Sequence, residues 1–206
     1  MRGFYFIPAF ILPITAAGPN PKVTVLVYNY AEISSKTLAQ TEREAARIFQ
    51  KSGIDSEWVG CPLTADESGK FPACPFQPRQ ADLILRIVPQ SMADRLRSVR
   101  DSFGFTMFPD DGSMPKTANV FSHDAEQIAK KNRVTSTAVL ATVIAHEIGH
   151  LLLGPESHSS GGIMKAHWRR NDLQTIAHGW MTFTPEQSEK MRSGAQARMT
   201  TERLGQ

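Results

Sequence analysis

The stretch STAVLATVIAHEIGHLLL, residues 136–153, decides the fold. It is apolar nearly all round at helical spacing, which predicts a helix that runs through a core rather than over a surface. Gly154 allows a left-handed end to this helix, and Pro155 prevents its continuation. The sequence therefore places this helix inside the domain.

Strand signals dominate the chain before this helix. Runs rich in β-branched and aromatic residues, bounded by turn residues, predict strands. Helical spacing with a serine cap and a glycine stop predicts a helix over residues 34–53, and shorter helices are expected at 91–98 and 123–132. Thr184, Pro185 and Gln187 form a capping-box start for a last helix. The expected strands are KVTVLVYNY (22–30), DSEWVGC (55–61), ADLILRIVP (81–89), FGFTMF (103–108) and TANVFS (117–122). This order indicates one mixed α/β (α+β) domain with a sheet of about five strands.

Length and composition suit a globular domain. The chain has 206 residues, of which 41% are hydrophobic and 21% charged, so disordered and fibrous classes are excluded. The formal charge is +3 without a dense run of Lys or Arg. We therefore expect no nucleic-acid partner.

The first residues have the layout of a secretory signal peptide. Arg2 precedes an apolar run from Phe4 to Ala17, and small residues follow. This predicts a signal peptide over residues 1–18 and a single exported domain over 19–206, periplasmic or extracellular. The run is short for a bilayer, so no stable membrane insertion of the mature chain is expected. A buried N-terminal strand or helix is the alternative.

Cys61 and Cys74 are the two cysteines of the chain. They bracket a loop rich in Pro, Gly and charged residues. In an oxidising compartment, two cysteines at this separation predict a disulfide bond. Closing such a loop would stabilise the fold by about 3 kcal/mol in the chain-entropy model.

Residues 146–164, HEIGHLLLGPESHSSGGIM, carry the candidate chemistry. His146 and His150 are four apart, so on a helix they project from one face and can bind one metal ion. Glu147 points toward the same pocket and is free to act as a base on water. Gly154 lets the chain turn, so that His158 can supply a third nitrogen. The alternative is a helix whose polar residues simply reach the surface.

This stretch resembles the metzincin clan of zinc endopeptidases over about a tenth of the chain. That clan shares a helix with His-Glu-x-x-His, a glycine turn, a third histidine and a methionine turn beneath the metal. The resemblance implies one catalytic Zn²⁺ bound by His146, His150 and His158. It also implies Glu147 as the general base and Met164 in the methionine turn.

The turn between the second and third histidines is two residues longer here than the usual clan spacing. Glu156 lies inside this longer turn and competes with His158 as the third ligand. The resemblance further implies an upper part over about 19–154 and a small lower lobe over about 155–206 that ends in a helix. In that clan the substrate pairs with the edge strand of the sheet, and residues 117–122 are expected to form that strand here.

The resulting expectation is an exported zinc metallopeptidase, a monomer that hydrolyses protein or peptide substrates. Glu147 would take a proton from the attacking water and return it to the leaving amine. Two alternatives stay open: a zinc hydrolase that acts on cell-wall peptides, and a non-catalytic exported domain that binds a metal. The downstream residues 165–180 give no pattern from which a substrate can be named.

Overall fold

The computed structural model describes residues 18–96 and 103–204. The predicted signal peptide, residues 1–18, lies outside this part of the chain apart from Gly18, so it stays a prediction. The elements are β1 (Lys22–Asn29), α1 (Ser35–Lys51), β2 (Asp55–Gly60), the 3₁₀ helix η1 (Ala65–Lys70), β3 (Leu83–Val88), α2 (Gln90–Leu96), β4 (Gly104–Thr106), β5 (Thr117–Phe121), α3 (Ser122–Asn132), α4 (Ser136–Leu153), α5 (Arg170–Ala177) and α6 (Pro185–Leu204).

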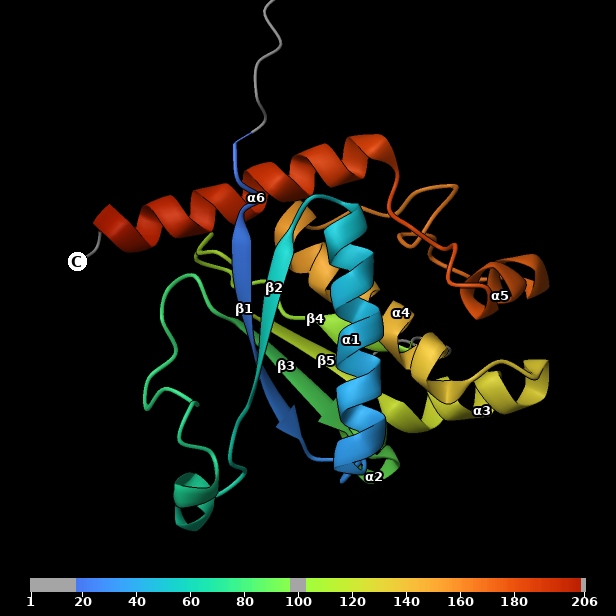
Figure 1. The fold of residues 1–206 in the computed structure, drawn as a ribbon, viewed down its shortest axis with the longest axis horizontal. Helices are drawn as coiled ribbons and strands as arrows, with labels where there is room; N and C mark the ends of the chain where they lie inside the picture. The colour runs from blue at the N-terminus through green and yellow to red at the C-terminus, as the bar shows by residue number, and fades with distance from the viewer. Residues whose placement is uncertain (1–17, 97–102, 205–206) are drawn as a thin grey trace, which may run out of the picture.

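The five strands form one mixed sheet in the order β2-β1-β3-β5-β4. The first four of these run parallel, while β4 pairs antiparallel with β5. Helices α1 and α4 lie over the sheet, and α6 crosses one end of it near the start of β1 (Figure 1). The predicted α/β class with a five-stranded mixed sheet is confirmed.

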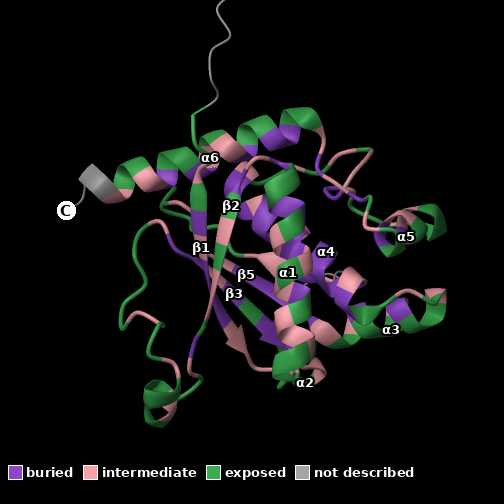
Figure 2. Cartoon of the chain, viewed as in Figure 1, coloured by how far each residue is buried: buried purple, intermediate pink, exposed green. Residues whose placement is uncertain are grey.

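Helix α4 is the centre of the main core, as its sequence predicts. Its apolar side chains pack with those of α1 and with the inward-facing residues of β1, β3 and β5. Figure 2 shows buried residues on these strands and on α4. Within the described residues α4 is long and apolar enough to span a membrane, but 72% of it is buried inside the fold. It is therefore read as a core helix.

The prediction that residues 117–122 form the edge strand is wrong. β5 lies between β3 and β4, so the strand at that edge is β4. Four of the five residues of β5 are buried, as expected for a strand covered on both faces. Among the described residues, no strand pairs with the outer edge of β4.

The chain after Gly154 forms loops, α5 and α6. The capping box of α6 is confirmed: Thr184 N–H donates to Gln187 Oε1 at 3.0 Å, and Gln187 N–H donates to Thr184 Oγ1 at 3.2 Å. Helix α5 was not predicted, because its sequence is mostly polar and it buries only Leu173 and Ile176. The loop residues between Gly154 and α5, rather than α5 itself, line part of the cavity beside the histidines.

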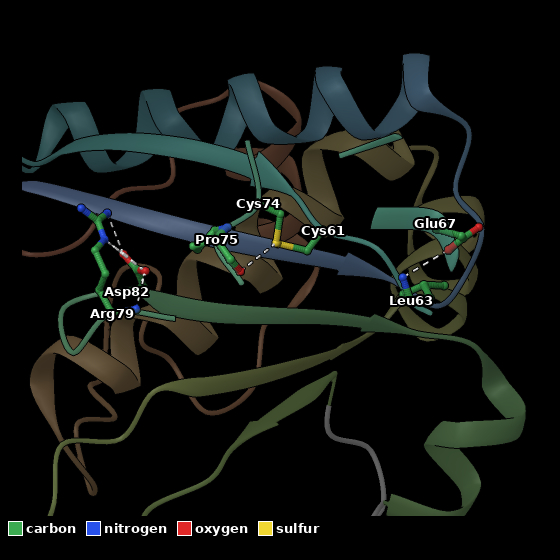
Figure 3. Close-up of a disulfide and its surroundings, with 7 residues drawn as sticks. All are labelled: Cys61, Leu63, Glu67, Cys74, Pro75, Arg79 and Asp82. Atoms are coloured by element: carbon green, nitrogen blue, oxygen red, sulfur yellow. Dashed lines mark hydrogen bonds and ion pairs between the residues drawn. A yellow bond between two sulfur atoms is a disulfide. The ribbon is translucent and has the colours of Figure 1, made fainter. Parts of the chain in front are cut away.

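Cys61 and Cys74 form a disulfide, with Cα atoms 5.2 Å apart (Figure 3). It closes the base of the exposed loop that carries η1. At the far end of the same connection, Arg79 Nη2 pairs with the buried Asp82 at 2.8 Å. The disulfide and this ion pair therefore restrain the connection between β2 and β3 near each of its ends.

Candidate metal centre

Helix α4 carries His146, Glu147 and His150 in its carboxyl-terminal half. Thr135 caps its start by accepting the N–H of Ala138 at 3.4 Å, and Gly154 ends it at φ +92° with its N–H on the carbonyl of His150 at 2.9 Å. Between these limits most of the helix is buried. His146 and Glu147 are therefore in the interior, where polar groups need partners.

The two helical imidazoles face each other. His146 Nε2 and His150 Nε2 are 3.1 Å apart. His146 Nδ1 lies 2.8 Å from the carbonyl oxygen of Ile163, and because a carbonyl only accepts, this nitrogen carries the proton. His146 Nε2 therefore presents a lone pair. Ser157 Oγ lies 2.9 Å from His150 Nδ1 and can accept a hydrogen bond from it, which leaves the lone pair of His150 on Nε2.

This arrangement fits a metal ion. Two ligands about 2.0–2.1 Å from a tetrahedral zinc lie about 3.3 Å apart, close to the spacing of the two Nε2 atoms. The outer nitrogen of each ring is held by an oxygen, as is usual for histidine ligands. Two neutral imidazoles with lone pairs aimed at one point repel each other, and a shared cation removes that repulsion.

His158 completes a cluster of three. One nitrogen from each of His146, His150 and His158 lies within 4.8 Å of the others. Among the described residues this group contains no carboxylate, so Glu156 is not part of it, although Glu156 lines the same cavity. Glu156 instead adopts φ +57° in the longer turn. Together with Gly154 it bends the chain so that the exposed His158 returns to the helix.

Burial keeps the histidines neutral. The pKa of His146 and of His150 is lowered to about 4, mainly by burial, and the neighbouring imidazoles contribute to this lowering. The pKa of His158 is also lowered, first by burial and then by His167. Because a metal binds neutral imidazole, these shifts favour metal binding at neutral pH.

Glu147 lies beside the cluster without joining it. Its side chain is 6% exposed, lines the cavity and accepts a hydrogen bond from Thr106 Oγ1 at 3.2 Å on Oε2. Burial raises its pKa to about 8. A nearby cation would favour the ionised form of this carboxyl.

His146, His150 and Glu147 together should make the stability of the metal-free protein depend on pH, with a maximum near pH 6.5. From pH 4.5 to 6.5 the unfolded chain protonates two histidines that stay neutral when folded, so stability rises with pH. Glu147 lowers the stability as the pH rises from about 4.5 to 8, because its carboxyl keeps its proton in the folded state and loses it in the unfolded chain. Below pH 6.5 the effect of the two histidines on the free energy of unfolding is larger than that of Glu147. Above pH 6.5 only Glu147 still changes the stability.

Urea unfolding of the chelator-treated protein from pH 5 to 8 measures this. The difference between wild type and Glu147→Gln isolates the carboxyl, and the wild type should lose stability relative to the variant as the pH rises to 8. A difference that does not change with pH would contradict the buried, protonated Glu147.

Met164 lies under the helix at Gly149. An ideal Cβ on Gly149 would be 2.6 Å from Met164 Sδ and 3.0 Å from Phe183 Cε1. Met164 is fully buried, and Ile163 next to it carries the carbonyl that holds His146. A glycine at 149 therefore lets the helix approach the segment that orients its first histidine.

Gly149→Ala should destabilise the fold by up to about 2 kcal/mol. Alanine would gain about 1 kcal/mol of helix propensity, but crowding in a packed core costs about 1–3 kcal/mol, and more when the neighbours cannot move. Denaturant unfolding measures the change. Gly69→Ala is the matched control, because a Cβ at Gly69 meets nothing within 4 Å. A Gly149→Ala protein more stable than wild type would contradict the close approach.

An open cavity of about 440 Å³ adjoins the three histidines and Glu147. Phe103 and Trp168 both line it and stack on each other, with ring centroids 5.8 Å apart. Trp168 Nε1 donates to the carbonyl of Ile163 at 3.2 Å. Trp168 therefore supports the same carbonyl that orients His146. The apolar lining comes from Phe103, Phe105, Phe108, Val143, Pro155 and Trp168.

The structure gathers some of the expected residues and adds others. His146, Glu147, His150, His158 and Met164 come together, whereas Cys61 and Cys74 form the disulfide in a loop that does not line the cavity. Sequence reasoning missed three residues, which are Thr106, Ser157 and Trp168. The first and last contact the site only through tertiary packing, but Ser157 stands inside the lengthened turn and is a hydroxyl within reach of a predicted ligand.

No protein-family model and no curated protein matches the chain. Among solved structures, it is similar to an archaemetzincin from Methanopyrus kandleri, with 11% identity, a TM-score of 0.48 and coverage of 89% of this chain and 99% of that one. It is also similar to metalloproteinase-II from Bacteroides fragilis, with 11% identity and a TM-score of 0.48, over 88% of this chain and 55% of that one. These likenesses are distant, so the case for a function rests on the cluster of histidines and its surroundings.

Proposed function

We propose that the chain is an exported, zinc-dependent endopeptidase whose catalytic domain spans residues 19–206. One observation carries the proposal: His146 and His150 aim their Nε2 atoms at a common point, His158 adds a third nitrogen, and a buried carboxyl stands beside them in an open cavity. Three histidines leave one position free in a tetrahedral zinc site, which is the arrangement of a catalytic rather than a closed structural site.

His146, His150 and His158 would hold the zinc ion. When bound, zinc supplies a Lewis acid, which polarises a carbonyl and makes water more acidic. Glu147 lies next to the first ligand with one carboxylate oxygen held by Thr106. It takes the proton of the attacking water and returns it to the leaving amine. Ile163 and Ser157 fix the orientation of the two helical imidazoles.

The substrate is an extended peptide that pairs with the outer edge of β4. No described strand occupies that edge, and β4 itself lines the cavity. An added strand gains affinity through backbone hydrogen bonds and specificity through pockets for its side chains. The aromatic lining favours a bulky apolar side chain next to the scissile bond.

The disulfide between Cys61 and Cys74 supports the proposed export, because such bonds persist in oxidising compartments. The predicted signal peptide would deliver the chain there. Within residues 19–206 we propose an upper part to about residue 154 and a lower lobe from about 155, with the histidine cluster between them.

Elemental analysis together with cleavage assays tests this function. We expect about one zinc per chain and cleavage of a quenched casein substrate that a chelator abolishes and zinc restores. A panel of folded proteins, unfolded proteins and cell-wall peptide cross-links assigns the substrate. Cleavage of the cross-links alone would favour a cell-wall hydrolase, and zinc without cleavage of any substrate would favour a non-catalytic metal-binding domain.

A further inference from the structure

The short edge strand β4 pairs with β5 along one edge and has packing contacts on both of its faces. Its ladder to β5 pairs Gly104 with Val120 and Thr106 with Ala118, and the N–H of Phe121 donates to the carbonyl of Phe103 at 2.8 Å just before it. On one face of the strand, the ring of Phe105 packs on that of Phe121, with centroids 6.1 Å apart. Because side chains alternate along a strand, Gly104 and Thr106 face the other way.

That other face lies against Glu147. An ideal Cβ on Gly104 would be 2.8 Å from Cγ and 3.0 Å from Cδ of Glu147, so the strand backbone lies directly along this side chain. Two residues on, Thr106 Oγ1 lies 3.2 Å from Glu147 Oε2 and 3.0 Å from the backbone carbonyl oxygen of Glu147. That carbonyl is inside α4 and already accepts a helical N–H. The single proton of Thr106 is thus shared between two oxygens of Glu147, and of these Oε2 has no helical N–H donor of its own.

We infer that Thr106 is a positioning residue, whose hydroxyl holds Oε2 of Glu147 and leaves Oε1 toward the cavity. This inference rests on the proposed function for its catalytic consequence, but the contact itself belongs to the fold. The strand that would bind the substrate on its outer edge is the same strand that holds the base. Pairing of a peptide with β4 would therefore place the scissile bond and the base on one rigid support.

The test compares Thr106→Val, which keeps the shape and removes the donor, with Thr106→Ser, which keeps the donor. A hydrogen bond to a charged group is worth about 10- to 100-fold in rate, so Thr106→Val should lower kcat by about that factor with KM changed less than about threefold. Thr106→Ser should recover most of the rate. Zinc content should stay near one per chain, and Thr117→Val on the neighbouring strand is the matched control.

A readout without turnover separates this inference from the proposed function. The ¹³C signal of the Glu147 carboxyl, assigned by its loss in Glu147→Gln, is compared at one fixed pH in the metal-free proteins. It should move in Thr106→Val and stay near the wild-type position in Thr106→Ser and Thr117→Val. An unmoved signal in Thr106→Val overturns the positioning role whatever the activity. A moved signal in a protein that cleaves no substrate keeps the contact and rejects the peptidase.

Discussion

Glu147→Gln should lower kcat by about 10²–10⁴-fold and leave the metal bound, which is the range that a positioned acid or base contributes. Glutamine keeps the size of the side chain and can still accept the hydrogen bond of Thr106, but it cannot accept a proton from water. Glu147 is not among the clustered ligand atoms, so its loss should not release the ion. Initial rates on a quenched peptide, with zinc measured on the same sample, check both parts.

Glu126→Gln is the matched control for this change. Glu126 is an exposed carboxyl on α3, away from the cavity lining. Its replacement should leave rate and zinc content at wild-type values. If Glu147→Gln cleaves as fast as wild type, the general-base assignment is wrong. If it loses the metal together with the activity, Glu147 acts as a ligand instead.

Most of the fold could be predicted because its elements are strongly periodic. Helix α4 was predicted with its observed bounds, since an apolar run between Thr135 and Gly154 allows few other lengths. The place of β4 could not be predicted. It has only three residues, and which of two successive strands is outermost depends on packing between distant segments. Helix α5 was missed because two buried residues give almost no pattern.

In the site, too, the features with a local sequence pattern could be predicted, and those that depend on packing between distant segments could not. His146, Glu147 and His150 could be grouped from spacing alone, because residues on adjacent helical turns must share a face. The contact of Thr106 with Glu147 joins residues 41 positions apart, and no local pattern encodes it. The stacking of Trp168 on Phe103 in the cavity lining is another contact between residues far apart in the sequence. The ligands are thus visible in the sequence, whereas the groups that orient the ligands and the base are mostly supplied by tertiary structure.

His158→Ala should weaken zinc binding by more than about 100-fold, because even the loss of an outer partner of a ligand costs 10- to 100-fold. His158 is the exposed member of the cluster and enters it from a turn rather than from the helix. Without it, His146 and His150 keep their positions on α4 but form only a two-coordinate site. Dialysis against graded chelator concentrations measures the affinity, and peptide cleavage should fall in parallel.

Two variants make this result decisive for the third ligand. Glu156→Ala removes the competing carboxylate of the longer turn, and it should retain zinc if His158 is the ligand. His178→Ala removes a histidine that stacks on Trp180 outside the cavity lining, with ring centroids 4.7 Å apart, and it controls for the loss of an imidazole. Zinc lost in Glu156→Ala but kept in His158→Ala would assign the carboxylate as the third ligand. In that case the turn would have to rearrange, because the structure gathers His158 with the helical pair and leaves Glu156 out.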